Sequence, residues 1–568
     1  MSRAPLLAAV AIGAVALAYA LPIQSVGCGQ NAHYAATRSF SAGRPYVDRY
    51  AQQTCDLVRV KGHHYAAKGP ALDFWSAPWY LLLHAAGAVP HDANAHANFP
   101  VAMVGVSPRA VWQIGLWAVV LPALGLLLLM WGTVERIEPG LGTAVAVTLG
   151  LATLVLPFST LLFAHVPAAG LGFLAFALLF EPGGSLVRVG AAGAAAGLAV
   201  AADLPLAVVA AAVGLYAAAR APRVRRLLAF AAGGVIGLAP LLAFDTWAFG
   251  SPFHLAYEGA AIDPGRGGVE QAHVGNLFYT LTSPHPHFAV DLLLSQRGLL
   301  VLSPVLVAGA IGTVMLWRRG LRAEAALIGG LALVEIAWQA FRPTYALALG
   351  GWVPGPRFLI AVVPFLCFAI APALRRAPAT VGALALASAG AMAVATSAEP
   401  LLSNDDTHHW IARIEHGNFA QTVLSLTGIG HGWEAILPFF ALVLLAAGTA
   451  AATVRTRPDV RGTALAAATL VAWVVIEHGA PALLQVDRLV HQDYGAVAAA
   501  LLLVGVVWTV VLAHRGDVHG AVLGLPLLVF AARRFDEHTK WALVLAAVVV
   551  AALWARDNVR LGTKAASA

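Results

Sequence analysis

Charge is the first thing this sequence has little of: only 11% of its 568 residues are Asp, Glu, Lys or Arg. Soluble domains carry about 25% charged residues, so the shortage excludes a chain built from soluble domains. Hydrophobic residues make up 60% of the chain, and runs of roughly 20 of them recur along its whole length, as in membrane-spanning helices. The sequence therefore predicts an all-α polytopic membrane protein.

Cysteine is also scarce, with three residues in the chain. Cys28 and Cys55 lie in one polar stretch, from Gln24 to about Asp73, whereas Cys367 lies within a hydrophobic segment. If the polar stretch faces an oxidising compartment, a Cys28–Cys55 disulfide would tie its parts together. A pair of free thiols is the alternative.

The hydrophobic runs predict roughly sixteen spans. They cover about 4–23, 110–132, 140–160, 163–181, 187–202, 204–219, 227–247, 298–317, 323–341, 358–374, 378–397, 434–453, 462–480, 495–513, 518–532 and 540–555. We expect the first run to be retained as a span, because it lacks a convincing small-x-small cleavage site followed by a soluble domain. The segment 74–89 is short for a crossing and contains a proline, so we expect an interfacial helix with Trp75 and Trp79 at headgroup depth.

Basic clusters between the spans predict the orientation. With Arg3, all but Arg533 and Arg534 fall on one side, which the positive-inside rule makes cytoplasmic together with both termini. The formal net charge of +7 is explained in this way, and we expect a lipid bilayer and no nucleic acid as a partner. The longer polar loops, at 24–109, 248–297, 342–357, 398–433 and 481–494, then lie outside.

The first of these loops holds the residue types that chemistry on a lipid-linked molecule requires. Lys68, like Lys61, Arg49 and Arg59, could neutralise a phosphate group. Asp48 or Asp56 could accept a proton from a hydroxyl group. The alternative is that all of these are ordinary solvated loop charges.

Several short motifs follow one another in a recognisable order. They are Asn31-Ala-His-Tyr, Tyr46-Val-Asp-Arg, Thr54-Cys-Asp, Gly62-His-His-Tyr-Ala-Ala-Lys-Gly-Pro-Ala-Leu, Phe163-Ala-His, Phe249-Gly-Ser-Pro, Ser295-Gln-Arg-Gly-Leu-Leu-Val-Leu-Ser-Pro and Gly350-Gly-Trp-Val-Pro-Gly-Pro-Arg. Together they resemble the GT-C glycosyltransferases, polytopic enzymes that include protein mannosyltransferases, aminoarabinose transferases and mycobacterial arabinosyltransferases. The resemblance covers about the first 375 residues.

The resemblance implies a GT-C-like helical bundle at 1–375, whose first external loop (24–109) carries juxtamembrane helices and the active site. Additional helices would occupy 376–568, with an external loop at 398–433. It also implies an inverting transferase in a bacterial plasma membrane, with its active site on the extracytoplasmic face. The donor would be a sugar on a polyprenyl phosphate, and the acceptor a glycan, a lipid or a protein.

Carried onto this sequence, the resemblance makes Asp48 or Asp56 the catalytic base, with Asp48 slightly preferred. Many members have Asp or Glu directly after the first span, where this chain has Gln30 and Asn31, and an amide cannot act as a base. Cationic side chains within the motifs would hold the donor phosphate. These are Lys68, Arg297 and Arg357.

Four further residues are expected to contact substrate: His63, His64, Tyr65 and His165. We expect no metal site, because adjacent histidines usually point apart and the pair His285 and His287 lacks a third ligand. A divalent cation (Mg²⁺, Mn²⁺ or Ca²⁺) is a candidate cofactor, for which the 398–433 loop offers Asp405, Asp406, His408 and His409. Four polar residues inside or at the ends of spans are also functional candidates: His165, Asp203, Asp245 and Glu335.

Two other functions compete with glycosyl transfer. A lipid or small-molecule transporter or flippase would be expected to show inverted repeats and mid-membrane charges, and no repeat is recognisable. A non-catalytic, lipid-binding relative of the transferases is favoured only by the amides at Gln30 and Asn31.

Overall fold

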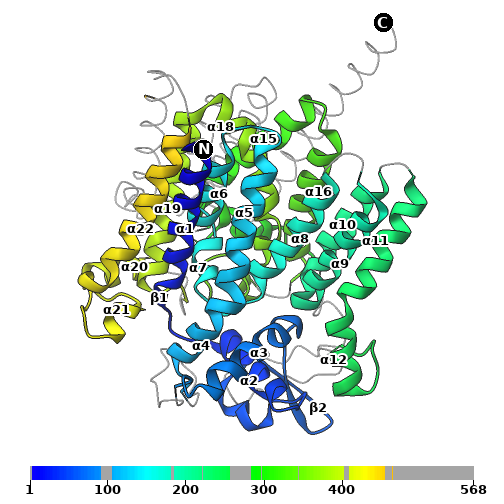
Figure 1. Cartoon of the computed structure of the whole chain (residues 1–568), viewed down its shortest axis with the longest axis vertical. Coiled ribbons are helices and arrows are strands. Elements are labelled where there is room, and N and C mark those ends of the chain that lie inside the picture. The colour runs from blue at the N-terminus through cyan, green and yellow to red at the C-terminus, as the bar shows by residue number, and fades with distance from the viewer. Residues whose placement is uncertain are drawn as a thin grey trace, which may run out of the picture.

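The computed structural model of the chain describes residues 3–90, 105–180, 184–219, 222–255, 283–295, 297–342, 345–401, 408–454 and 464. Its regular structure is a bundle of helices with a smaller polar layer at one end (Figure 1). In the described part the strands are four short segments, arranged as two separate pairs. The all-α class predicted from the hydrophobic runs is therefore confirmed.

The bundle is built from the following helices, which coincide with the predicted spans except for Pro286–Leu294 and Tyr345–Leu349, in the predicted loops 248–297 and 342–357. They are α1 (Arg3–Ala20), α4 (Pro108–Gly115), η2 (Leu116–Val120), α5 (Leu121–Glu135), α6 (Gly142–Leu151), α7 (Val155–Ser159), α8 (His165–Phe180), α9 (Leu186–Ala202), η3 (Leu204–Leu206), α10 (Ala207–Ala218), α11 (Arg223–Gly237), α12 (Ala239–Phe249), α13 (Pro286–Leu294), α14 (Leu299–Leu302), α15 (Val305–Arg318), α16 (Arg322–Gln339), α17 (Tyr345–Leu349), η5 (Arg357–Ala361), α18 (Val363–Arg376), α19 (Pro378–Ala398) and α22 (Trp433–Thr453).

Three of these helical segments are long and apolar enough to cross a membrane by themselves: Pro108–Glu135, Pro378–Ala398 and Trp433–Thr453. Two bent pairs, α11 with α12 and α13–α14 with α15, raise the number to five if each is one span. Other runs, such as α8 and α9, form apolar helices of fewer than 18 residues. The protein is thus a helical membrane protein, while the count of sixteen stays a prediction, and its last four spans lie outside the described residues.

The polar layer is made mainly by the first predicted external loop. It contains α2 (Cys28–Ser41), η1 (Asp48–Gln53), a hairpin of β2 (Leu57–Val60) and β3 (His63–Ala66), and α3 (Ala71–Ala85). The hairpin turn consists of Lys61 and Gly62, both with positive φ (49° and 89°), as two-residue hairpin turns of type I′ require. The antiparallel register pairs Leu57 with Ala66 and Val60 with His63.

A second segment, part of the loop predicted at 398–433, joins the same end of the bundle. It contains α20 (His408–Glu415), β4 (Gln421–Thr422) and α21 (Val423–Leu426), and β4 pairs with β1 (Pro22–Ile23), directly after α1. At the opposite end, Glu138 pairs with Arg319 and with Arg375, the latter at 2.9 Å. Among the described residues, the polar layer and these two arginines therefore lie at opposite ends; the orientation in the membrane stays a prediction.

Helix α3 covers the segment predicted to lie at the membrane interface. Trp75, 46% exposed, stacks on Trp117 of η2 with ring centroids 4.9 Å apart. The indole N–H of Trp79 donates to the carbonyl of Gln113 at 3.0 Å. The aromatic face of α3 thus packs along the adjoining long helix, near the end where the polar layer begins.

Helices α9 and α11 approach each other backbone to backbone. A Cβ atom on Gly193 would lie 1.9 Å from the carbonyl oxygen of Phe230, and one on Gly233 would lie 1.9 Å from that of Gly190. Such contact between small residues is how helices in membranes pack most closely. It fixes the position of α9, whose C-terminal end leads into the site described next.

Candidate active site

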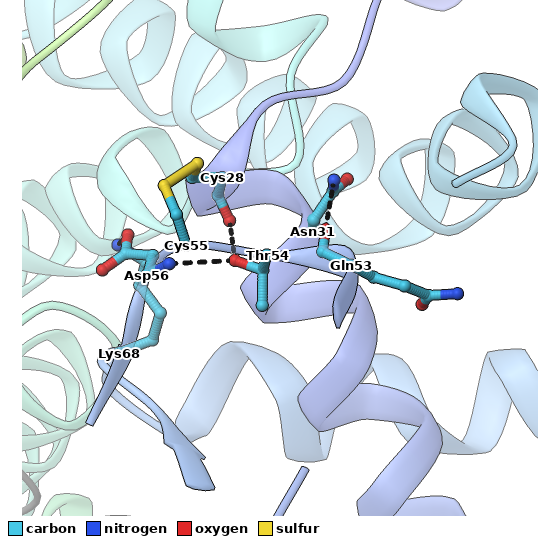
Figure 2. Close-up of a disulfide and its surroundings, with 7 residues drawn as sticks. All are labelled: Cys28, Asn31, Gln53, Thr54, Cys55, Asp56 and Lys68. Carbon is cyan, nitrogen blue, oxygen red and sulfur yellow. Dashed lines mark hydrogen bonds and ion pairs between the residues drawn. A yellow bond between two sulfur atoms is a disulfide. The ribbon is translucent and has the colours of Figure 1, made fainter. Parts of the chain in front are cut away.

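Cys28, the first residue of α2, forms a disulfide with Cys55, just before β2, with Cα atoms 5.2 Å apart (Figure 2). The hydroxyl group of Thr54 donates to the carbonyl of Cys28 at 2.7 Å and accepts from the backbone N–H of Asp56 at 3.1 Å. The carboxylate of Asp56 in turn pairs with the ammonium group of Lys68, beyond the hairpin. The disulfide therefore holds the base of the hairpin against the start of α2.

Gln30 and Asn31, the two amides near the start of α2, are buried and have hydrogen-bond partners. Gln30 donates to the carbonyl of Ser25 and accepts from the backbone N–H of Leu162, both at 3.0 Å. Asn31 donates to the carbonyl of Gln53 at 2.7 Å (Figure 2). In this chain these positions connect α2 to the surrounding loops.

At the Lys68-Gly69-Pro70 segment the first loop packs against the helical bundle. A Cβ atom on Gly69 would lie 2.5 Å from the carbonyl oxygen of Ala202, the last residue of α9, so only glycine allows this approach. Pro70 then caps α3. The step places Lys68 at the mouth of the bundle, beside the end of α9.

A cavity of about 310 Å³ lies where the loop meets the bundle. Its polar lining comes from four regions of the chain: the first loop, the start of α8, the end of α9 and the segment from α16 to η5. The polar residues that line it are His33, Lys68, His165, Asp203, Glu335, Trp338, Arg342 and Arg357. Five residues predicted from sequence are thus brought to one cavity from positions far apart in the chain: Lys68, His165, Asp203, Glu335 and Arg357.

Among the cations that line the cavity, Arg357 has the fewest hydrogen-bond and ion-pair partners within the described residues. Its Nε is buried without a hydrogen-bond partner, and within the described part of the chain its guanidinium group makes no hydrogen bond or ion pair. It lies over the rings of Phe163 and Phe358, 5.6 and 5.1 Å from their centroids. Because a buried donor without a partner is unfavourable, this guanidinium group is suited to receive an anion from the cavity.

Arg342 is a third cation of the cavity and was not predicted from sequence. It is 4% exposed, its Nε donates to the side-chain oxygen of Gln339 at 3.3 Å, and it lies 5.4 Å from the ring centroid of Phe358. It follows the end of α16 without a matching motif, so no local pattern marked it.

His165, the first residue of α8, forms a pair with Asp203, which caps α9. The distance from His165 Nδ1 to Asp203 Oδ2 is 2.5 Å. The imidazole packs among the rings of Phe158, Phe163 and Phe358 at centroid distances of 5.7 to 5.9 Å. The ring is held in one orientation, with its edge in the cavity wall.

A second histidine–aspartate pair lies on the loop side of the cavity. His33 Nδ1 is 2.8 Å from Asp73 Oδ1, and both side chains are buried. Burial raises the pKa of Asp73 despite the opposing effect of His33. The pair joins α2 to α3 beneath the cavity.

The structure does not bring Asp48, His63, His64 or Tyr65 to the cavity lining. Asp48 lies beside the hairpin turn, where Oδ2 is 2.6 Å from His63 Nδ1 and Oδ1 accepts from the backbone N–H of His64 at 2.6 Å. Partial burial alone would raise the pKa of Asp48, but these hydrogen bonds hold it below its usual value. Burial and the nearby charge of Asp48 raise the pKa of Tyr65.

Arg297 also lies outside the cavity lining. It is 5% exposed, and its guanidinium group donates to the carbonyl of Val353 at 2.9 Å. It therefore contacts the segment that leads to Arg357, not the cavity itself. Among the described residues no group of three or more His, Cys, Asp or Glu side chains could hold a metal ion; Asp405 and Asp406 lie outside these residues.

An open apolar groove of about 620 Å³ runs between α10 and α16. Val208 lines both the groove and the polar cavity. On α16, Val334 lines the groove and the next residue, Glu335, lines the cavity. The cavity thus adjoins an apolar surface made by α10 and α16.

No family model matches the chain, and no curated protein matches it. Solved structures similar to it include ArnT from Cupriavidus metallidurans in the apo state (15% identity, 94% of this chain and 76% of that chain, TM-score 0.41). The same enzyme bound to undecaprenyl phosphate is similar too (15% identity, 94% and 77%, TM-score 0.40). A third is the archaeal oligosaccharyltransferase AglB from Archaeoglobus fulgidus in complex with an inhibitory peptide and a dolichol-phosphate (16% identity, 83% and 58%, TM-score 0.38). With TM-scores near 0.4, we draw nothing about the site from these likenesses.

Proposed function

We propose that this protein is a membrane glycosyltransferase that moves a sugar from a polyprenyl-phosphate donor to an acceptor hydroxyl group. One observation carries the proposal: Lys68, Arg342 and Arg357 converge on one cavity, and an apolar groove adjoins that cavity at Val208. A phosphate with a long hydrocarbon chain has the two chemistries that such neighbouring surfaces bind. The motif resemblance of the first 375 residues points to the same class.

The three cations hold the phosphate of the donor. As the bond between the anomeric carbon and the phosphate oxygen breaks, negative charge grows on the leaving polyprenyl phosphate. Preplaced cations in a water-poor site stabilise that charge more than they stabilise the ground state. Arginine adds two parallel donors to a phosphate, whereas Lys68 acts as a compact charge.

The acceptor oxygen attacks the anomeric carbon, and its proton passes to a carboxylate as the new bond forms. Neither of the two loop acids predicted from sequence lines the cavity, and Asp56 is our first candidate because its ion-pair partner Lys68 does. Asp48 stays a second candidate at the other end of the hairpin. The sugar is transferred with inversion, and the site faces the extracytoplasmic side in this proposal.

The test is transfer of radiolabelled sugar by the purified protein from polyprenyl-phosphate donors. Wild type is compared with Asp56→Asn, Asp48→Asn and Lys68→Met, with and without a chelator. We expect transfer to be lost in Asp56→Asn and Lys68→Met and kept in Asp48→Asn. If a broad donor set gives no transfer while the lipid phosphate still binds, the protein is a binding or transport protein.

A further inference from the structure

Glu335 lines the cavity but has no role in the proposed phosphate binding or proton transfer. Its side chain is 0% exposed, it lines the cavity, and neither carboxyl oxygen has a hydrogen-bond partner in the described part of the chain. An unpartnered carboxyl group in an interior is costly, and such groups call for a specific explanation. A ligand that enters the cavity would supply the missing hydrogen bonds.

The neighbours of Glu335 on α16 narrow the chemistry of that ligand. Trp338, three residues on, lies on the same face of the helix and lines the same cavity, as does Arg342, just after the helix ends at Gln339. Behind them the side-chain nitrogen of Gln339 is buried and also lacks a partner, while its oxygen accepts from Arg342. This face therefore offers hydrogen-bonding groups next to an aromatic ring and a cation.

A sugar ring fits this combination better than a lipid chain or a metal ion. A carboxyl group accepts hydrogen bonds from hydroxyl groups, and a tryptophan ring packs its flat apolar face against the C–H groups of a sugar. A lipid chain would leave Glu335 unpartnered. The described residues offer no third His, Cys, Asp or Glu that would complete a metal site with it.

We propose that Glu335 and Trp338 bind and select the sugar that the lipid-phosphate donor carries. The proposal rests on the proposed function, because Arg342 places this sugar site directly beside the phosphate cations. Glu335 holds the sugar hydroxyl groups and Trp338 packs against the ring, so the anomeric carbon is positioned at the phosphate. Neither residue takes part in the proton transfer.

The experiment measures binding alone and needs no acceptor. Decaprenyl phosphate and decaprenyl phosphates that carry mannose, glucose, galactose, arabinose or N-acetylglucosamine are titrated into the purified protein in detergent, with a chelator present. The variants are Glu335→Gln and Trp338→Leu. The matched control is Glu324→Gln, a buried acid on the same helix whose carboxylate accepts from the hydroxyl group of Tyr216 at 2.6 Å, away from the cavity lining.

For wild type and Glu324→Gln we expect at least one sugar to bind about tenfold more tightly than bare decaprenyl phosphate. For Glu335→Gln and Trp338→Leu that ratio falls to within twofold of unity, while the Kd for the bare lipid changes less than twofold. The sugar site is wrong if Glu335→Gln keeps the wild-type ratio of sugar-lipid to bare-lipid affinity, or if wild type prefers no sugar. Either result leaves the proposed phosphate site unaffected. If bare decaprenyl phosphate fails to bind wild type, the proposed function itself is wrong.

Discussion

Replacing Arg357 by glutamine is the cleanest perturbation of the phosphate site. Its guanidinium group forms no direct ion pair among the described residues. It interacts electrostatically with Asp203, but Asp203 keeps its direct partner His165 when Arg357 is replaced. The equivalent change at Lys68 would leave the carboxylate of Asp56 unpaired. A lower lipid affinity in Arg357→Gln can therefore be attributed to the lost contact with the ligand.

The expected magnitude follows from the contact that is lost. A hydrogen bond to a charged group contributes about 1.5–3 kcal/mol, which corresponds to a Kd for decaprenyl phosphate raised about 10- to 150-fold. Loss of contact with the rings of Phe163 and Phe358 removes about 0.5–1 kcal/mol of stability, so the melting temperature should change little. Arg357→Lys keeps the charge but not the paired donors and should fall between wild type and Arg357→Gln.

The assay is titration of decaprenyl phosphate by thermophoresis, with thermal melting of each variant measured in the same detergent. The control is Arg318→Gln, an exposed arginine at the end of α15, which should leave both measurements unchanged. A Kd for Arg357→Gln within twofold of wild type would refute the assignment of this guanidinium group to the phosphate.

Three further changes have defined outcomes. Cys28→Ser with Cys55→Ser opens a loop of sequence separation 27, which should lower stability by about 3.5 kcal/mol; an unchanged melting temperature would contradict this. Because the folded-state pKa of Asp48 lies below its usual value, its stabilising contribution is present above the ordinary pKa of about 3.9 and disappears as pH falls through the lowered value. The protection factors of the β2–β3 hairpin amides, which compare their exchange rates with those of an unstructured chain at the same pH, should therefore fall at low pH in wild type. Asp48→Asn should already show low protection at pH 6; equal protection at pH 6 would count against it. Gly69→Ala should cost about 1–3 kcal/mol and reduce sugar transfer, because its methyl group would strike the carbonyl of Ala202; full transfer would show that the loop adjusts freely.

The sequence was most informative where the signal is local. Each predicted span up to residue 454 falls on one or more helices, because hydrophobic runs report burial in lipid directly. Lys68 and Arg357 could be predicted because each lies in a sequence motif. In the motif that contains Lys68, Gly69 allows the loop to approach the carbonyl of Ala202, and Pro70 directly precedes α3.

The rest of the site depends on distant packing that no local pattern encodes. Arg342 and Trp338 face the cavity only because the end of α16 lies beside η5. Asp48 was preferred as the base, yet the hairpin register places it near His63, at the turn, whereas Asp56 lies at the open end. The two ends are about 13 Å apart, the length of four strand residues. The sequence motifs alone could not show which of the two acids lies at which end of the hairpin.

The backbone contact between α9 and α11 has a consequence for anyone who screens random variants of this protein. Asp203 sits at the end of a helix whose position is set by Gly193 and Gly233, neither of which lines the cavity. An alanine at either glycine would push the two helices apart and move Asp203 with them. Inactive clones that carry such changes would therefore mark the scaffold beneath the site, and they should not be counted as evidence that these glycines touch a substrate.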